Sequence, residues 1–243
     1  MKGKLTLAKI LEVGGIVSAI VLVAFGVTAI VLGADGRSTV QSNLAQEYIV
    51  GTPDMTPTGI VPAIEAVKQA QKKLAAARAK AGADPIELTE VEAPRCSVAG
   101  KLVNNGDRAR CFAQYMRIHA LEGTSGLVYA QMGRYLAKPD APPKATDFNG
   151  GTNDPKYAVT DPKTGQPVSN GARNVWVTET ALASALNLAY TAEQVSTFGI
   201  VVGVALLLSG IGFAILAVAA FHQRVKAEEK ERAGVVLRPT TAR

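Results

Sequence analysis

Two long stretches without a charged residue constrain this chain more than any other feature of its sequence. They cover residues 13–34 and 195–221. A bilayer core about 30 Å thick is crossed by about 20 apolar residues in a helix. The sequence therefore predicts two transmembrane helices, over residues 10–33 and 195–221. A cleaved signal peptide is the alternative for the first stretch, although the apolar region of such a peptide is usually only about 7–15 residues long.

The distribution of basic residues predicts how these helices are oriented. The chain has a net charge of +6 and an isoelectric point near 9.3. The region between the apolar stretches is almost neutral, and most of the excess lies outside it. The flanking basic residues are Lys2, Lys4, Lys9, Arg224, Lys226, Lys230, Arg232, Arg238 and Arg243. This positive-inside pattern predicts cytoplasmic segments at 1–9 and 222–243 and an extracytoplasmic region at 34–194, and it argues against a nucleic-acid partner.

Apolar residues at helical spacing continue beyond both predicted spans. We therefore expect an all-α membrane protein whose two transmembrane helices extend outward as an antiparallel helical hairpin stalk. This stalk would carry a small disulfide-pinned helical extracytoplasmic domain. The predicted stalk-packing residues are Val40, Leu44, Tyr48, Val177, Leu182, Leu186 and Tyr190. Trp176 lies too far from the predicted span to be a membrane-interface aromatic, so we expect it in the core.

Small residues recur along both apolar stretches, and in lipid they allow helices to approach closely. The predicted packing residues are Gly15, Ala19, Gly26, Gly199, Gly203, Ser209 and Gly210. These residues fit packing of the two spans within one chain; contact between copies or with a foreign subunit is the alternative. Neither stretch contains an ionisable residue. Because such residues mark ion and proton pathways, this argues against a transporter, pump or proton relay.

The extracytoplasmic region contains both cysteines, Cys96 and Cys111. An even number in an oxidising compartment favours a disulfide, and two separate buried thiols are the alternative. We expect a helix over residues 62–81, opened by Pro62 and ended by Gly82. Its basic face is either solvated or binds anionic lipid or cell-wall polymer. Two short helices, from Cys111 and from Ser125, and a flexible loop over 138–173 complete the predicted domain.

The sequence contains few candidate catalytic or metal-binding residues. His119 is the only histidine in the predicted outer region, and a zinc or non-haem iron site needs at least one more His or Cys ligand in the same place. His119 and Glu122 could form a base with an orienting carboxylate, but a structural pair is the simpler interpretation. We therefore predict no catalytic, cofactor-binding or metal-binding residues, no cofactor and no enzymatic activity.

Four segments carry a resemblance to a known family. They are IVGTPDMTP (49–57), CFAQYMRIHALEGTSGLVYAQMGRYL (111–136), DPKTGQPV (161–168) and RNVWVTETALASALNLAYTAEQVSTFGIVVGVALLLSGIGF (173–213). They resemble a family of actinobacterial two-span membrane proteins of unknown function, often labelled aromatic ring-opening dioxygenases. The resemblance implies a bacterial cell membrane and transfers no catalytic residue. The label itself requires two histidine ligands to iron, which this outer region could supply only by pooling His119 from several copies.

These observations predict a non-enzymatic membrane protein that acts as a scaffold or accessory subunit of a cell-envelope complex. Its expected partners are the lipid bilayer and other membrane proteins or copies of itself. A homo-oligomeric assembly or pore is the alternative, motivated by the small-residue faces and weakened by the uncharged apolar stretches.

Overall fold

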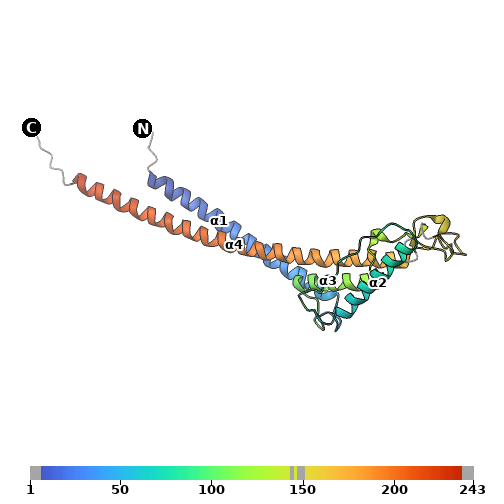
Figure 1. Ribbon diagram of the computed structural model, residues 1–243. Coiled ribbons are helices and arrows are strands. Elements are labelled where there is room, and N and C mark those ends of the chain that lie inside the picture. Colours follow the sequence, from blue (N-terminus) through green and yellow to red (C-terminus); the bar gives the residue numbers. More distant parts are fainter. Residues whose placement is uncertain (1–6, 143–144, 147–150, 237–243) are drawn as a thin grey trace, which may run out of the picture. The chain divides into compact units, whose positions relative to one another are not determined.

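The computed structural model describes residues 7–142, 145–146 and 151–236, and within them the chain is mostly helical (Figure 1). The predicted termini therefore fall partly outside the described residues, as do short pieces of the predicted loop 138–173. The elements are α1 (Leu7–Gln46), α2 (Val61–Lys80), α3 (Gly106–Gly123), η1 (Tyr129–Gln131), β1 (Tyr135–Leu136), β2 (Gly151–Thr152), η3 (Pro155–Tyr157) and α4 (Gly171–Val236). Two compact units result: one contains the chain up to Ser38 and from Gln194 onward, and the other contains Thr39–Glu193.

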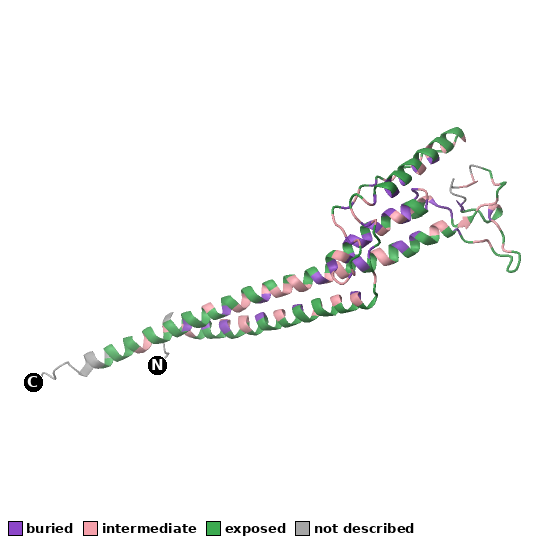
Figure 2. Ribbon diagram, turned by 90° about the horizontal axis from the view of Figure 1, so that it is seen from below, coloured by how far each residue is buried: buried purple, intermediate pink, exposed green. Residues whose placement is uncertain are grey.

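In the first unit, α1 and α4 are both long and apolar enough to cross a membrane. Their large apolar side chains are mostly exposed, and the green ribbon of Figure 2 follows most of both helices in this unit. Phe25 and Phe198, for example, are 65% and 69% exposed. Apolar surface of this extent is unfavourable in water and favourable in lipid. These exposures therefore fit the two predicted spans.

Within this unit, α1 and α4 lie side by side at their small residues (Figures 1 and 2). A Cβ placed on Gly26 would lie 2.8 Å from the Gly203 carbonyl oxygen, and one on Gly203 would lie 2.7 Å from the Gly26 carbonyl oxygen. Such distances are too short for any side chain. A Cβ on Gly210 would similarly lie 3.0 Å from the Val23 nitrogen. The missing side chains therefore allow the two backbones to touch.

The other predicted membrane-packing residues are distributed unevenly. Gly15 and Ala19 are buried, and a Cβ on Gly15 would lie 3.0 Å from the Ala217 Cβ. Gly199 makes only ordinary contact, 3.7 Å from a built Cβ to the Ala29 carbonyl oxygen. Ser209 is exposed, and its hydroxyl donates to the Ala205 carbonyl of its own helix at 2.8 Å. The grouping of Ser209 with this contact face was wrong, because it lies one position before the buried Gly210.

The second unit has a hydrophobic core built mainly from α2, α3 and the loops between them. Its largest completely buried apolar side chains are Tyr115, Ile60, Leu121, Leu127, Val67, Val98 and Val103. Pro62 in the first turn and Gly82, at φ +62°, bracket α2 as predicted. α3 begins earlier than predicted, because the Asn105 side chain caps it by accepting from the Arg108 backbone N–H at 2.9 Å. Trp176 is 3% exposed and joins this core, as predicted.

The predicted stalk-packing residues fall partly in this unit's core. Leu44 and Leu186 are buried, while Val40, Leu182 and Tyr190 are half-buried. Tyr48 is 82% exposed, because α1 ends at Gln46 and Tyr48 adopts a positive φ in the turn that follows. Val177 is 54% exposed, because the neighbouring Trp176 occupies the inward position. The predictions for Tyr48 and Val177 were therefore wrong. The buried positions of α4 here are Trp176, Glu179, Leu186 and Glu193.

The segment after α3 contradicts the predicted helix from Ser125. Ser125 and Gly126 have φ values of +55° and +80°, and the left-handed conformation ends the helical path. The short helix η1 and the antiparallel pair β1–β2 follow, with Tyr135 opposite Thr152. The described part of 138–173 also has regular hydrogen bonding. Residues 161–165 form a turn, closed by the Gly165 N–H donating to the Asp161 carbonyl at 2.9 Å.

Candidate functional site

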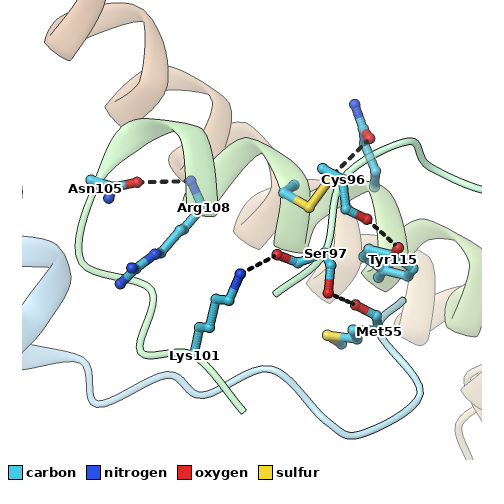
Figure 3. Close-up of a disulfide and its surroundings, with 9 residues drawn as sticks. Met55, Cys96, Ser97, Lys101, Asn105, Arg108 and Tyr115 are labelled. Carbon is cyan, nitrogen blue, oxygen red and sulfur yellow. Dashed lines mark hydrogen bonds between the residues drawn. A yellow bond between two sulfur atoms is a disulfide. The ribbon is translucent and has the colours of Figure 1, made fainter. Parts of the chain in front are cut away.

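The Cys96–Cys111 disulfide forms as predicted and fastens the loop before α3 to the first turns of that helix (Figure 3). The two Cα atoms lie 6.0 Å apart. The Tyr115 hydroxyl, one turn further along α3, donates to the Cys96 carbonyl at 2.6 Å. Burial, reinforced by the nearby Asp54 carboxylate, raises the pKa of Tyr115 and keeps it a hydrogen-bond donor. The disulfide and this hydrogen bond fix the position of α3 against the loop.

His119, on the same helix, lies between two carboxylates. Its Nε2 is 3.0 Å from Asp54 Oδ2, and its Nδ1 is 3.3 Å from Glu122 Oε2. The sequence predicted the Glu122 contact from helical spacing. It did not predict Asp54, which comes from the turn before α2. The Thr52 hydroxyl donates to Asp54, and this bond, assisted by His119, holds the pKa of Asp54 below its usual value despite partial burial. Both ring nitrogens of His119 are therefore engaged.

A groove of about 470 Å³ opens beside His119, between α3 and the first turns of α4. Most of its surface is apolar. Met116, His119 and Ala120 line it from α3, and Gly171, Asn174, Val175, Thr178 and Glu179 line it from α4. This volume falls within the range of small-ligand sites, which are typically about 300–1,000 Å³, apolar and furnished with a few polar groups. The groove is therefore the candidate functional site of this unit.

Glu179 is the most unusual group in the groove. It is only 5% exposed, yet its hydrogen-bond partner is the Thr180 hydroxyl at 3.5 Å, which is a weak contact. Among the described residues, no basic side chain lies within ion-pair distance of it. Burial raises the pKa of Glu179, and attraction to Arg117 and the Thr180 contact oppose this only in part. The Arg117 guanidinium itself lies over the Trp176 ring, 5.1 Å from its centroid.

Glu193, two heptads further along α4, is buried in a different way. It is 7% exposed and accepts hydrogen bonds from the Gly106 backbone N–H and, at 2.8 Å, from the Gln41 side chain. Gly106 is the first residue of α3, where backbone N–H groups lack helical partners. Glu193 therefore completes the start of α3, which is a structural role. Among the residues that the structure describes, Glu179 has no comparable partner.

The sequence contained a signal for these two glutamates that periodicity alone could reveal. Trp176, Glu179, Ala183, Leu186, Tyr190 and Glu193 follow one another at alternating spacings of three and four residues. Positions of this spacing share one helix face. Two acidic residues on an otherwise apolar face indicate buried carboxylates. The predicted packing residues of α4 began at Val177, which is exposed, and did not include the two glutamates.

The described residues contain no group of three or more His, Cys, Asp and Glu side chains placed to hold a metal ion. The chain matches no protein-family model, no curated protein and no solved structure.

Proposed function

We propose that this chain is a non-enzymatic integral membrane protein whose domain at residues 34–194 acts outside the cell membrane as a scaffold or accessory subunit of an envelope complex. The observation that carries the proposal is the open, mostly apolar groove on a domain pinned by a disulfide. A pinned domain presents such a surface without first paying the entropy of ordering it. We further propose, from the resemblance to actinobacterial two-span proteins, that this membrane is that of an actinobacterium.

The proposed architecture is an antiparallel hairpin of α1 and α4 that passes through the bilayer and continues outside it. Its support is helix length: α4 has 66 residues and α1 has 40. At 1.5 Å per residue these helices are about 100 Å and 60 Å long, whereas a bilayer core is about 30 Å thick. The flanking basic residues favour cytoplasmic termini, and the disulfide favours an oxidising outer compartment for the domain.

The surroundings of His119 support a non-enzymatic role. A metal-bound histidine offers one ring nitrogen to the metal and donates from the other. Here Asp54 and Glu122 occupy the two nitrogens. An iron site built from several copies of His119 would have to break one of these contacts. The ring-opening dioxygenase label therefore gains no support from this arrangement.

The alternative is a homo-oligomeric assembly or pore. Outward-facing small residues favour it: Ser209 is exposed, and a Cβ on Gly14 would meet nothing within 4 Å. However, the tightest small-residue contact, between Gly26 and Gly203, is used within one chain. An anchor made of two self-packed helices therefore accounts for more of the observed contacts than a pore does.

The mass of the native particle tests the proposal. The protein would be tagged at its C-terminus, expressed in its own host, extracted in mild detergent or polymer, and analysed by native mass spectrometry. The proposal predicts foreign subunits at a fixed ratio to this chain. A homogeneous homo-oligomer would favour the alternative, and a lone monomer under every mild condition would contradict both.

A further inference from the structure

A purely structural role does not explain Glu179, because the burial of its carboxylate is unfavourable in free energy. An ionised carboxylate removed from water is unfavourable unless a counter-ion or several hydrogen bonds replace its hydration. Glu193 shows how α4 satisfies this requirement elsewhere, through Gly106 and Gln41. Glu179 has one long hydrogen bond and a distant attraction to Arg117. A glutamine or leucine would pack at this position without the cost, so a structural role alone does not explain the acid.

The surroundings of Glu179 indicate what would compensate it. Met116, Ala120 and Val175 supply apolar surface along the groove that Glu179 lines. The two further carboxylates near the groove, on Asp54 and Glu122, are directed to His119. Arg117, the basic group whose attraction acts on Glu179, lies over the Trp176 ring. The groove therefore combines an apolar wall with an incompletely neutralised negative charge.

We propose that this groove binds a lysine side chain of a partner protein, with the apolar stem along Val175 and Met116 and the ammonium group on Glu179. Lysine suits the site because it carries a compact charge on a flexible apolar stem of four carbons. This inference rests on the proposed function, because it gives the chemistry by which an accessory subunit would hold its partner. Pairing with an ammonium group would return to Glu179 the favourable contacts that burial removed.

The test uses full-length protein in detergent micelles and n-butylamine as the probe. Trp176 is the only tryptophan in the chain, and it lies three residues before Glu179 on the same face of α4. Its fluorescence therefore reports on the groove. At neutral pH we expect a saturable change with butylamine. The uncharged isostere n-butanol, which enters micelles at least as readily, should give at least ten-fold weaker binding.

Three variants locate the charge and the groove. Glu179→Gln keeps the shape of the side chain and should weaken butylamine binding at least ten-fold. Glu122→Gln is the matched control, since Glu122 is close to the groove but does not line it, and should change binding less than about two-fold. Thr178→Leu places a larger side chain at an exposed position of the groove and leaves Glu179 unchanged. It should also weaken butylamine binding.

Equal binding of butylamine and butanol, or unchanged binding in Glu179→Gln, would overturn the inference. The proposed function would then still stand if the native particle contains foreign subunits. Conversely, if butylamine binds but the native particle is always a monomer, the groove is a binding site and the proposed accessory role is contradicted. The two proposals can therefore fail separately.

Discussion

Glu179 and Glu193 lie on one face of α4, equally hidden from water and unequally satisfied. The carboxylate of Glu193 bonds to the backbone at the start of α3, whereas that of Glu179 faces a groove. At the scale of single residues, this difference separates a structural acid from a candidate binding group. Groups that lower the stability of the fold and make no stabilising contact in exchange are common at functional sites.

The raised pKa of Glu179 gives a prediction for stability. A carboxyl group whose pKa is higher in the folded than in the unfolded state binds more protons when folded, so stability falls as pH rises from its ordinary pKa of 4.5 through the raised one. Glu179→Gln removes this loss. We therefore expect the variant to unfold at a higher temperature than the wild type at pH 7, with the difference shrinking to zero below about pH 4.5.

Thermal unfolding followed by Trp176 fluorescence measures this difference. Glu122→Gln is the control for removing a carboxylate near the groove. An unfolding temperature for Glu179→Gln below that of the wild type at pH 7 would show that Glu179 stabilises the fold, and would contradict its assignment as an unsatisfied group.

Only some of the residues at this site could be predicted from the sequence. It identified His119 and Glu122 because they are neighbours on one helix turn. Asp54 was missed because it meets His119 through the packing of a distant turn, which local spacing does not reveal. Glu179 was missed because the exposed Val177 was taken as the first packing residue of α4, although Trp176 was expected in the core. A shift of one residue rotates a helix face by about 100°, enough to exchange buried and exposed positions.

At the scale of elements, periodicity and composition predicted the long helices well. Pro62 and Gly82 indicated α2 near its observed bounds, and the predicted spans 10–33 and 195–221 lie within α1 and α4, which both extend well beyond them. The disulfide followed from the even number of cysteines. The short elements after Ser125 were not predicted, because Leu127 and Met132 have helical spacing but positive φ at Ser125 and Gly126 redirects the backbone. Such conformations depend on tertiary contacts as much as on local sequence.

The contact between α1 and α4 gives a prediction about the membrane helices. Gly15→Cys and Ala217→Cys would place two Cβ atoms about 3.0 Å apart, close enough for a disulfide with a small adjustment. Cross-linking within one chain should therefore be efficient under mild oxidation. Adding Gly26→Ile places side-chain atoms against the Gly203 carbonyl and should lower the cross-linking yield several-fold.

The matched control is Gly212→Ile, because a Cβ at Gly212 meets nothing within 4 Å. It should leave the yield of the intramolecular cross-link unchanged, as measured on non-reducing gels and by mass spectrometry of the linked peptides. If Gly26→Ile cross-links as well as Gly212→Ile does, the two helices do not pack through Gly26 and Gly203 in the membrane.

At the scale of the whole molecule, the account depends on which side of the membrane each segment occupies. Residues 34–194 must lie outside for the groove to meet an envelope partner, and both ends of the chain must lie in the cytoplasm. Both native cysteines are joined in the disulfide, so an introduced cysteine is the only free thiol. This makes labelling on intact cells free of background from the protein itself.

The most direct test therefore compares two single variants, Lys163→Cys in the exposed turn of the domain and Lys226→Cys after the second apolar stretch. Intact cells expressing each variant would be treated with a membrane-impermeant maleimide, before and after permeabilisation. The account predicts that position 163 is labelled on intact cells and position 226 only after permeabilisation. Labelling of position 226 on intact cells, or protection of position 163 until permeabilisation, would contradict it.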